Sequence, residues 1–136
     1  MAPFWTRRDG NVAVEFALIA PVFLAMLLGI MSYGGYFWMA HSVQEIADDS
    51  ARAALAGLTA DERQTLVRAT LSSEIAKYGT LNPAAATATY TGDAQGYTVA
   101  ISYDASRSNG VFWAGGLVPM PSSTIVRSAT IKMGGF

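Results

Sequence analysis

The residues with the most suggestive spacing for chemistry are His41, Glu45 and Asp48. At i, i+4 and i+7 they would share one face of a helix, where an imidazole and two carboxylates are able to hold a divalent cation. The alternative is a solvated polar face in which Asp48 pairs with Arg52, and spacing alone favours this alternative. The sequence therefore predicts no metal site and no cofactor.

Residue types for enzyme catalysis are scarce in this chain. His41 is the only histidine and there is no cysteine, so Cys–His pairs and Cys/His metal clusters are impossible. No serine lies in a G-x-S-x-G elbow, and no glycine loop has the pattern that binds phosphate. The 9 Lys and Arg residues against 10 Asp and Glu give no excess of positive charge for nucleic acid. We expect neither an enzyme nor a nucleic-acid-binding protein.

Glu15 is the unusual acid of the chain, because it lies near the start of a long apolar segment. No charged residue occurs from Phe16 to Ala40, and 25 residues of helix reach about 38 Å, against a hydrocarbon core of about 30 Å. An ionised acid near mid-bilayer costs about 2.5–3.5 kcal/mol. The pattern predicts a transmembrane helix at residues 11–40 in which Glu15 needs a partner.

The charges on either side of the span predict its direction. Arg7 and Arg8 precede it, whereas Glu45, Asp48 and Asp49 follow it. Because basic flanks stay in the cytoplasm, residues 41–136 are expected outside. The aromatic residues near the outer end would then form an interfacial belt: Tyr33, Tyr36, Phe37 and Trp38.

Two features inside the span predict a bend and a contact. Pro21 removes the hydrogen bond to the Ala17 carbonyl and should kink the helix. Ala25 and Gly29 form a small-x-x-x-small pair that would seat a neighbouring helix.

The residues around Gly10 carry a family resemblance. After a basic leader and before an apolar helix stands Gly10-Asn11-Val12-Ala13-Val14-Glu15-Phe16, which resembles a class III signal read by a prepilin peptidase. The longer string VEFALIAP, residues 14–21, is similar to the TadE-like pseudopilins of the tight-adherence (Tad, type IVb Flp pilus) machinery. The resemblance implies that residues 1–10 are a leader cut between Gly10 and Asn11. It also implies that Glu15 and Phe16 act in assembly.

The same resemblance implies a location, a function and a set of partners. The protein would cross the bacterial inner membrane once and support pilus biogenesis, adhesion and surface attachment. Its partners would be the prepilin peptidase, other pilins or pseudopilins and the pilus assembly platform. The alternative is a signal-anchored periplasmic binding or adaptor domain in which Glu15 is incidental.

Helical periodicity continues beyond the apolar segment. Apolar residues at helical spacing extend the first helix to about Ala56: Val43, Ile46, Ala47, Ala51 and Ala54. Gly57 ends it, and Thr59-Ala60-Asp61-Glu62 is a capping box for a second helix through about Tyr78, with Gly79 at its C-cap. The apolar stripe of that helix would consist of Val67, Leu71, Ile75 and Tyr78.

Strand periodicity takes over after Asn82-Pro83. Alternating residues predict strands at 86–91 and 97–104, joined as a hairpin through residues 92–96, and a third strand at 124–133. The expected fold class is α+β, in which helices cover a three-stranded antiparallel sheet in a pilin-like arrangement.

The connection from Ser106 to Ser123 is long and apolar. We expect Phe112 and Trp113 to fold back over the sheet and complete its core. The alternative is an exposed aromatic patch that docks a partner subunit or a membrane surface.

Overall fold

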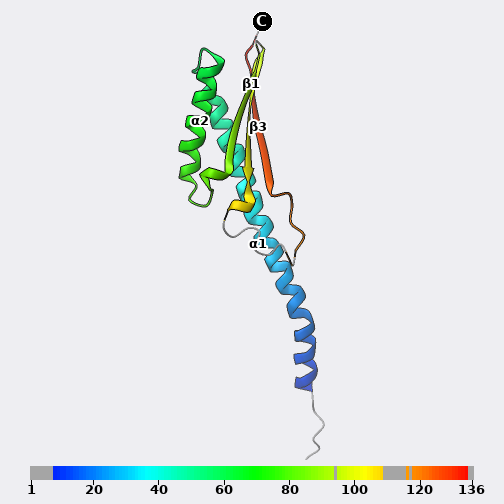
Figure 1. Cartoon of the computed structure of the whole chain (residues 1–136). Coiled ribbons are helices and arrows are strands. Elements are labelled where there is room, and N and C mark those ends of the chain that lie inside the picture. The colour runs from blue at the N-terminus through cyan, green and yellow to red at the C-terminus, as the bar shows by residue number, and fades with distance from the viewer. Residues whose placement is uncertain (1–7, 94, 109–115, 117, 135–136) are drawn as a thin grey trace, which may run out of the picture.

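The computed structural model describes residues 8–93, 95–108, 116 and 118–134, with side chains from Asn11 onward. Its main elements, shown in Figure 1, are α1 (Arg8–Ala54), α2 (Ala60–Lys77), β1 (Ala86–Gly92), β2 (Gly96–Asp104) and β3 (Thr124–Lys132). Two 3-10 turns, Pro83–Ala85 and Ala105–Arg107, begin β1 and end β2. The predicted α+β fold is confirmed.

The helix α1 has two halves with different surroundings. Its 47 residues span about 70 Å. The C-terminal half packs against α2 and the sheet, whereas the N-terminal half projects away from both (Figure 1). The predicted apolar face of the packed half is fully buried: Val43, Ile46, Ala47, Ala51 and Ala54. The helix ends at Ala54, two residues before the predicted end.

The turn between the two helices depends on a close backbone approach. A Cβ atom at Gly57 would lie 2.8 Å from the backbone nitrogen of Arg63, so only glycine fits there. The capping box is confirmed, since the Thr59 side chain accepts from the Glu62 N–H and the Glu62 carboxylate accepts from the Thr59 N–H.

The C-terminal end of α2 differs from the prediction. Its C-cap is Tyr78 in an extended conformation, and Gly79 has no left-handed φ. The Tyr78 N–H bonds to the Ile75 carbonyl at 3.2 Å and closes the last turn without a left-handed residue. Of the predicted apolar stripe, Val67, Leu71 and Ile75 are buried. Tyr78 is half-buried and packs against the core from its position as the C-cap.

The sheet has the strand order β1-β2-β3, with both pairs antiparallel. Every second residue of the central strand β2 is buried under the helices: Tyr97, Val99, Ile101 and Tyr103. The predicted hairpin and third strand are confirmed, although β3 ends at Lys132 rather than Met133. Ile125 is buried on β3, while Arg127, two residues further along, is exposed.

A tyrosine from the sheet satisfies the last turn of α1. The Leu55 N–H bonds to the Arg52 carbonyl, so it is not used by the Ala51 carbonyl four residues before it. The buried Tyr97 hydroxyl donates to that Ala51 carbonyl at 2.7 Å. This contact fixes the sheet to the end of the helix.

Tyr97→Phe removes the hydroxyl and leaves the Ala51 carbonyl buried without a donor. We expect the free energy of unfolding to fall by about 1–3 kcal/mol, measured by urea unfolding of the full chain in detergent. Tyr90→Phe is the control, because the Tyr90 hydroxyl has only a long contact of 3.4 Å with Arg63 Nη1. Equal losses in the two variants would contradict the assigned role of Tyr97.

Candidate functional site

The N-terminal half of α1 is the most unusual surface in the described structure. From Asn11 to Leu27 every residue is exposed except the half-buried Ala20, and most of these side chains are apolar. Large apolar groups point outward around the helix, as in Phe16 at 71 % exposure and Leu24 at 55 %. Within the described residues, this is the one helix long and apolar enough to cross a membrane. The surface suits lipid or other apolar helices rather than water.

The predicted processing and assembly residues all lie at the beginning of this helix. Gly10, Asn11, Glu15 and Phe16 belong to α1. Asn11 and Glu15 are one turn apart, about 6 Å along the axis, and therefore share a face. Both side chains are exposed, and Glu15 forms no ion pair or hydrogen bond within the part of the chain that is described. The described residues thus leave Glu15 open to an external partner.

Pro21 lies inside α1, which continues on both sides of it. A bend at Pro21 stays a prediction. At Gly29, which was predicted with Ala25 to seat a neighbouring helix, the Val118 side chain of the same chain comes close. A Cβ atom there would lie 3.6 Å from the Val118 side chain. The packing of a second helix here stays a prediction.

An aromatic group marks the junction between the projecting and packed halves of α1. The Phe37 ring lies 6.3 Å from Tyr33 and 6.0 Å from Tyr36, and the Trp38 ring lies 6.0 Å from Tyr78. Phe37 and Trp38 remain 64 % and 46 % exposed. The predicted aromatic residues therefore gather at the level where the domain begins.

The cluster of His41, Glu45 and Asp48 does not converge on a ligand. Glu45 accepts a hydrogen bond from the Tyr78 hydroxyl at 2.7 Å, and Asp48 accepts from Gln44 Nε2 at 3.1 Å. No group of three metal-binding side chains occurs among the described residues. Glu45 and Asp48 instead hold the Tyr78 and Gln44 side chains in place.

The predicted pairing of Asp48 with Arg52 was wrong. Arg52 binds Asp49 at 2.9 Å, one residue away from the predicted partner. Gln44, one helical turn before Asp48, donates a hydrogen bond from Nε2 to the Asp48 carboxylate. The same nitrogen also donates to the Ser128 carbonyl of β3 at 3.2 Å. Asp48 is therefore engaged on the side that faces the sheet.

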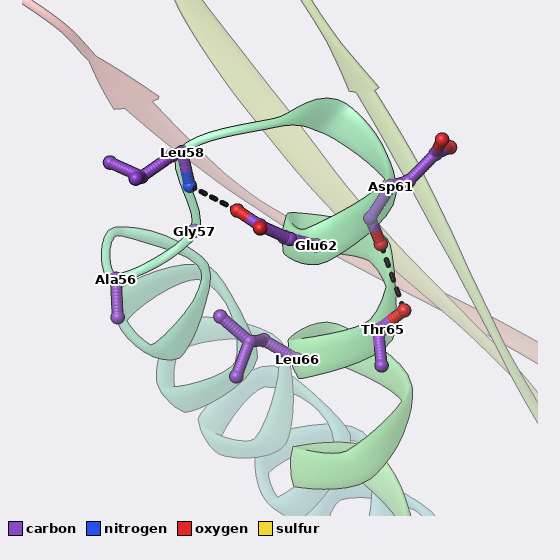
Figure 2. Close-up of a pocket in the computed structure, with 7 residues that line it drawn as sticks. All are labelled: Ala56, Gly57, Leu58, Asp61, Glu62, Thr65 and Leu66. Carbon is purple, nitrogen blue, oxygen red and sulfur yellow. Dashed lines mark hydrogen bonds between the residues drawn. The ribbon is translucent and has the colours of Figure 1, made fainter.

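A shallow pocket lies at the turn between α1 and α2 (Figure 2). This turn is at the end of the domain farthest from the projecting half of α1 (Figure 1). Its lining combines apolar and acidic residues: Ala56, Gly57, Leu58, Asp61, Glu62, Thr65 and Leu66. Leu58 is 89 % exposed, which is unusual for a leucine. The sequence predicted the capping box here but not the pocket, because the exposure of Leu58 depends on how the two helices meet.

One of the two acids that line this pocket, Glu62, accepts hydrogen bonds from backbone N–H groups. Glu62 accepts from the Leu58 N–H at 2.8 Å and the Thr59 N–H at 3.1 Å. The Leu58 and Thr59 N–H bonds lower the pKa of the Glu62 carboxyl below its usual value. An ionised carboxylate engaged by two donors is poorly suited to general acid catalysis.

The predicted aromatic pair Phe112 and Trp113 lies outside the described residues. After this stretch the chain passes beside α1, where the Tyr33 hydroxyl donates to the Pro119 carbonyl at 2.6 Å. Sequence reasoning missed this contact, which joins residues 86 positions apart.

Comparison with known proteins identifies the segment that carries these residues. The family model described as TadE-like protein matches residues 10–52, which include Gly10, Glu15 and most of the packed half of α1. No curated protein and no solved structure matches significantly. The suspected resemblance is confirmed over this segment, and it indicates a membrane-anchored component associated with the Tad pilus.

The hydrogen bond between Tyr78 and Glu45 makes a prediction about pH. It raises the pKa of Tyr78 to about 12. Between the unfolded value near 10 and this value, the unfolded chain loses a proton that the fold retains, so stability should fall as pH rises through that window. Glu45→Gln should lower the pKa of Tyr78 toward 10, measured by the absorbance of tyrosinate.

The control for this titration is Glu74→Gln, because Glu74 pairs with Lys77 and affects Tyr78 only weakly. An unchanged titration in Glu45→Gln would contradict the assigned cause. A shift of equal size in both variants would do so as well.

Proposed function

We propose, from the TadE-like segment at residues 10–52, that the protein is a pseudopilin of a Tad/Flp type IVb pilus assembly system. A prepilin peptidase removes residues 1–10, and the mature protein supports pilus biogenesis, adhesion and surface attachment. Its partners are other pilins or pseudopilins and the assembly platform. The observation that carries this proposal is an exposed apolar half-helix whose single acid from Asn11 to Leu28, Glu15, has no partner among the described residues.

The proposed topology follows from the charges and the single apolar helix. Arg7 and Arg8 keep the amino end in the cytoplasm. The projecting half of α1 crosses the inner membrane, and the α+β domain lies in the periplasm.

Assembly gives Glu15 a partner, which it lacks among the described residues of its own chain. Cleavage after Gly10 would create an ammonium group on Asn11, one helical turn before the carboxylate. Either charge is unfavourable alone in lipid. In a bundle staggered by about one turn, Glu15 of one subunit meets the Asn11 amine of the next. The competing arrangement is a pair within one chain, which needs no assembly.

The second candidate function is an anchored periplasmic binding or adaptor domain. The pocket at the far end of the domain favours it, since the exposed Leu58 lines this pocket together with Asp61. The two functions differ in what the start of α1 must do. Only the pseudopilin requires Gly10 and Glu15 to act together.

We predict cleavage between Gly10 and Asn11 in cells that contain a prepilin peptidase. The mass of the intact protein should correspond to residues 11–136, and Gly10→Lys should prevent processing because a long side chain blocks the close backbone approach. Retention of Met1 in the unsubstituted protein would refute the proposal.

A reporter active only outside the cytoplasm, fused after Phe136, tests the topology in the same cells. A silent reporter would overturn the orientation.

Glu15→Gln tests the assembly role of the carboxylate. The variant should insert and be cleaved normally, because size and polarity are kept. Its copurification with other pilus subunits should fall more than about tenfold, the expected result of losing a charged hydrogen bond of about 1.5–3 kcal/mol.

Asp49→Asn is the matched control, since it removes an acid on the exposed side of the same helix and breaks only the surface pair with Arg52. Normal copurification and normal pili with Glu15→Gln would exclude the intersubunit pair. Loss of copurification in both variants would indicate a general effect of charge.

A further inference from the structure

We propose that residues 118–121, the segment just before β3, rest on the outer leaflet of the membrane, and that the hydrocarbon layer ends near Leu28 rather than at Ala40. This inference rests on the proposed function only in requiring that α1 spans a membrane. The protein would then contact lipid at two places, the projecting half of α1 and the 118–121 segment of the domain.

The protein cover of α1 begins at a definite level. Below Leu28 the helix is exposed on nearly all sides, whereas Leu28 and Gly29 are half-buried and Ser32 is 1 % exposed. The Val118 side chain lies against Gly29. The Tyr33 hydroxyl, one turn further along, donates to the Pro119 carbonyl. The 118–121 segment is therefore the part of the domain that reaches furthest toward the amino end of α1 among the contacts described here.

The uncovered length of helix matches a membrane. Asn11 to Leu28 is 18 residues, about 27 Å of helix, close to the hydrocarbon thickness of about 30 Å. On the face of α1 that the domain covers, a span of this length leaves no exposed spacer between the lipid and the domain, whereas Ile30 and Met31 stay exposed on other faces. The 118–121 segment then lies at the membrane surface.

The levels of the strands can be read from two contacts with α1. The Tyr97 hydroxyl reaches Ala51, and Tyr97 pairs with Ile131 of β3. Gln44 reaches Ser128. The step from Ser128 to Ile131 in β3 and the step from Gln44 to Ala51 in α1 each cover about 10 Å. The strand and the helix therefore run side by side in the same direction (Figure 1).

The same scale places the beginning of β3. Thr124 lies four residues before Ser128, which is about 13 Å along the strand. The same distance along α1 is about nine residues before Gln44, so Thr124 lies near the level of Gly35. Asp104 pairs with Thr124 and lies at that level. Its exposed neighbour Arg107 follows within one 3-10 turn.

These two charged residues limit how far lipid can rise. The Ser106 hydroxyl donates to Asp104 at 2.6 Å and lowers the pKa of that carboxyl, so Asp104 is ionised. A hydrocarbon layer that reached Ala40 would surround Asp104 and Arg107, where charges are strongly unfavourable. The layer must therefore end below Gly35, which leaves Tyr33 and the 118–121 segment in the interfacial region.

The chemistry of the segment suits that region. Its sequence is Val118-Pro119-Met120-Pro121, with no charged side chain and two residues that lack an N–H donor. Fewer backbone donors lose hydration when such a segment approaches lipid. Tyrosine is itself enriched at interfaces, and Tyr33 binds the segment directly. The segment is continuous with the apolar lipid-facing surface of α1, and this continuity identifies lipid as the occupant.

Single-cysteine labelling tests the inference, because the chain has no cysteine. Full-length Met120→Cys, and separately the more exposed Pro119→Cys, would carry an environment-sensitive fluorophore in phosphatidylcholine–phosphatidylglycerol vesicles. Quenchers fixed near the headgroups should reduce the emission at either position several-fold. Aqueous iodide should act several-fold less there than on Leu58→Cys at the far end of the domain.

Two further labels fix the depth. Leu24→Cys should be quenched from within the hydrocarbon. Phe37→Cys, 64 % exposed in the structure, should respond to iodide. Circular dichroism matching that of the unsubstituted protein is required for each labelled variant that is compared.

The outcomes separate this inference from the proposed function. Labels at 119 and 120 as accessible to iodide as Leu58→Cys would overturn the lipid contact, and protection from both quenchers would indicate a protein cover instead. Quenching of Phe37→Cys from within the hydrocarbon would overturn the boundary near Leu28. Failure of Leu24→Cys to sense lipid would overturn the membrane span and with it the proposed function.

Discussion

The structure depends on the close packing of the upper half of α1 against the sheet. Alanines at 47, 51 and 54 let β2 approach the helix, and the Tyr97 hydroxyl then replaces the missing backbone donor of Ala51. The core below this contact is completed by α2 through Val67, Leu71 and Ile75. Without the helix the three strands would lose the apolar surface that covers their buried face, and a small isolated sheet is only marginally stable.

One helix therefore serves two environments. Its upper half is amphipathic and completes a protein core, while its lower half is apolar on all sides and suits lipid or other helices. The change occurs within a few residues of Gly29, where Val118 first contacts the helix. Glu15 is exceptional because it is an acid in the apolar half with no described partner from its own chain, and this makes it the residue of greatest functional interest.

Local signals predicted most of this fold, because local physics determines them. The capping box at Thr59, the alternation in β2 and the buried stripe of α1 are each encoded within a few residues. Two local predictions were wrong. Asp48 accepts a hydrogen bond from Gln44 instead of pairing with Arg52, and the last turn of α2 is closed by the Tyr78 N–H bond to the Ile75 carbonyl instead of by a C-cap at Gly79. The TadE-like motif lies in residues 10–21, and the family model extends the match to residue 52. The contact of Tyr33 with Pro119 and the exposure of Leu58 depend on tertiary placement and have no local signature.

The continuity of α1 has a mechanical consequence. The helix is unbroken from Arg8 to Ala54, and the sheet is fastened to it at Gln44 and Ala51. The membrane segment and the domain thus form a single lever. From Leu28, the proposed end of the hydrocarbon layer, to Ala54 the arm measures about 39 Å, so a tilt of about ten degrees would displace the far end of the domain by about 7 Å. A pull on that end would likewise be transmitted through continuous helix as far as Pro21, where the predicted bend lies.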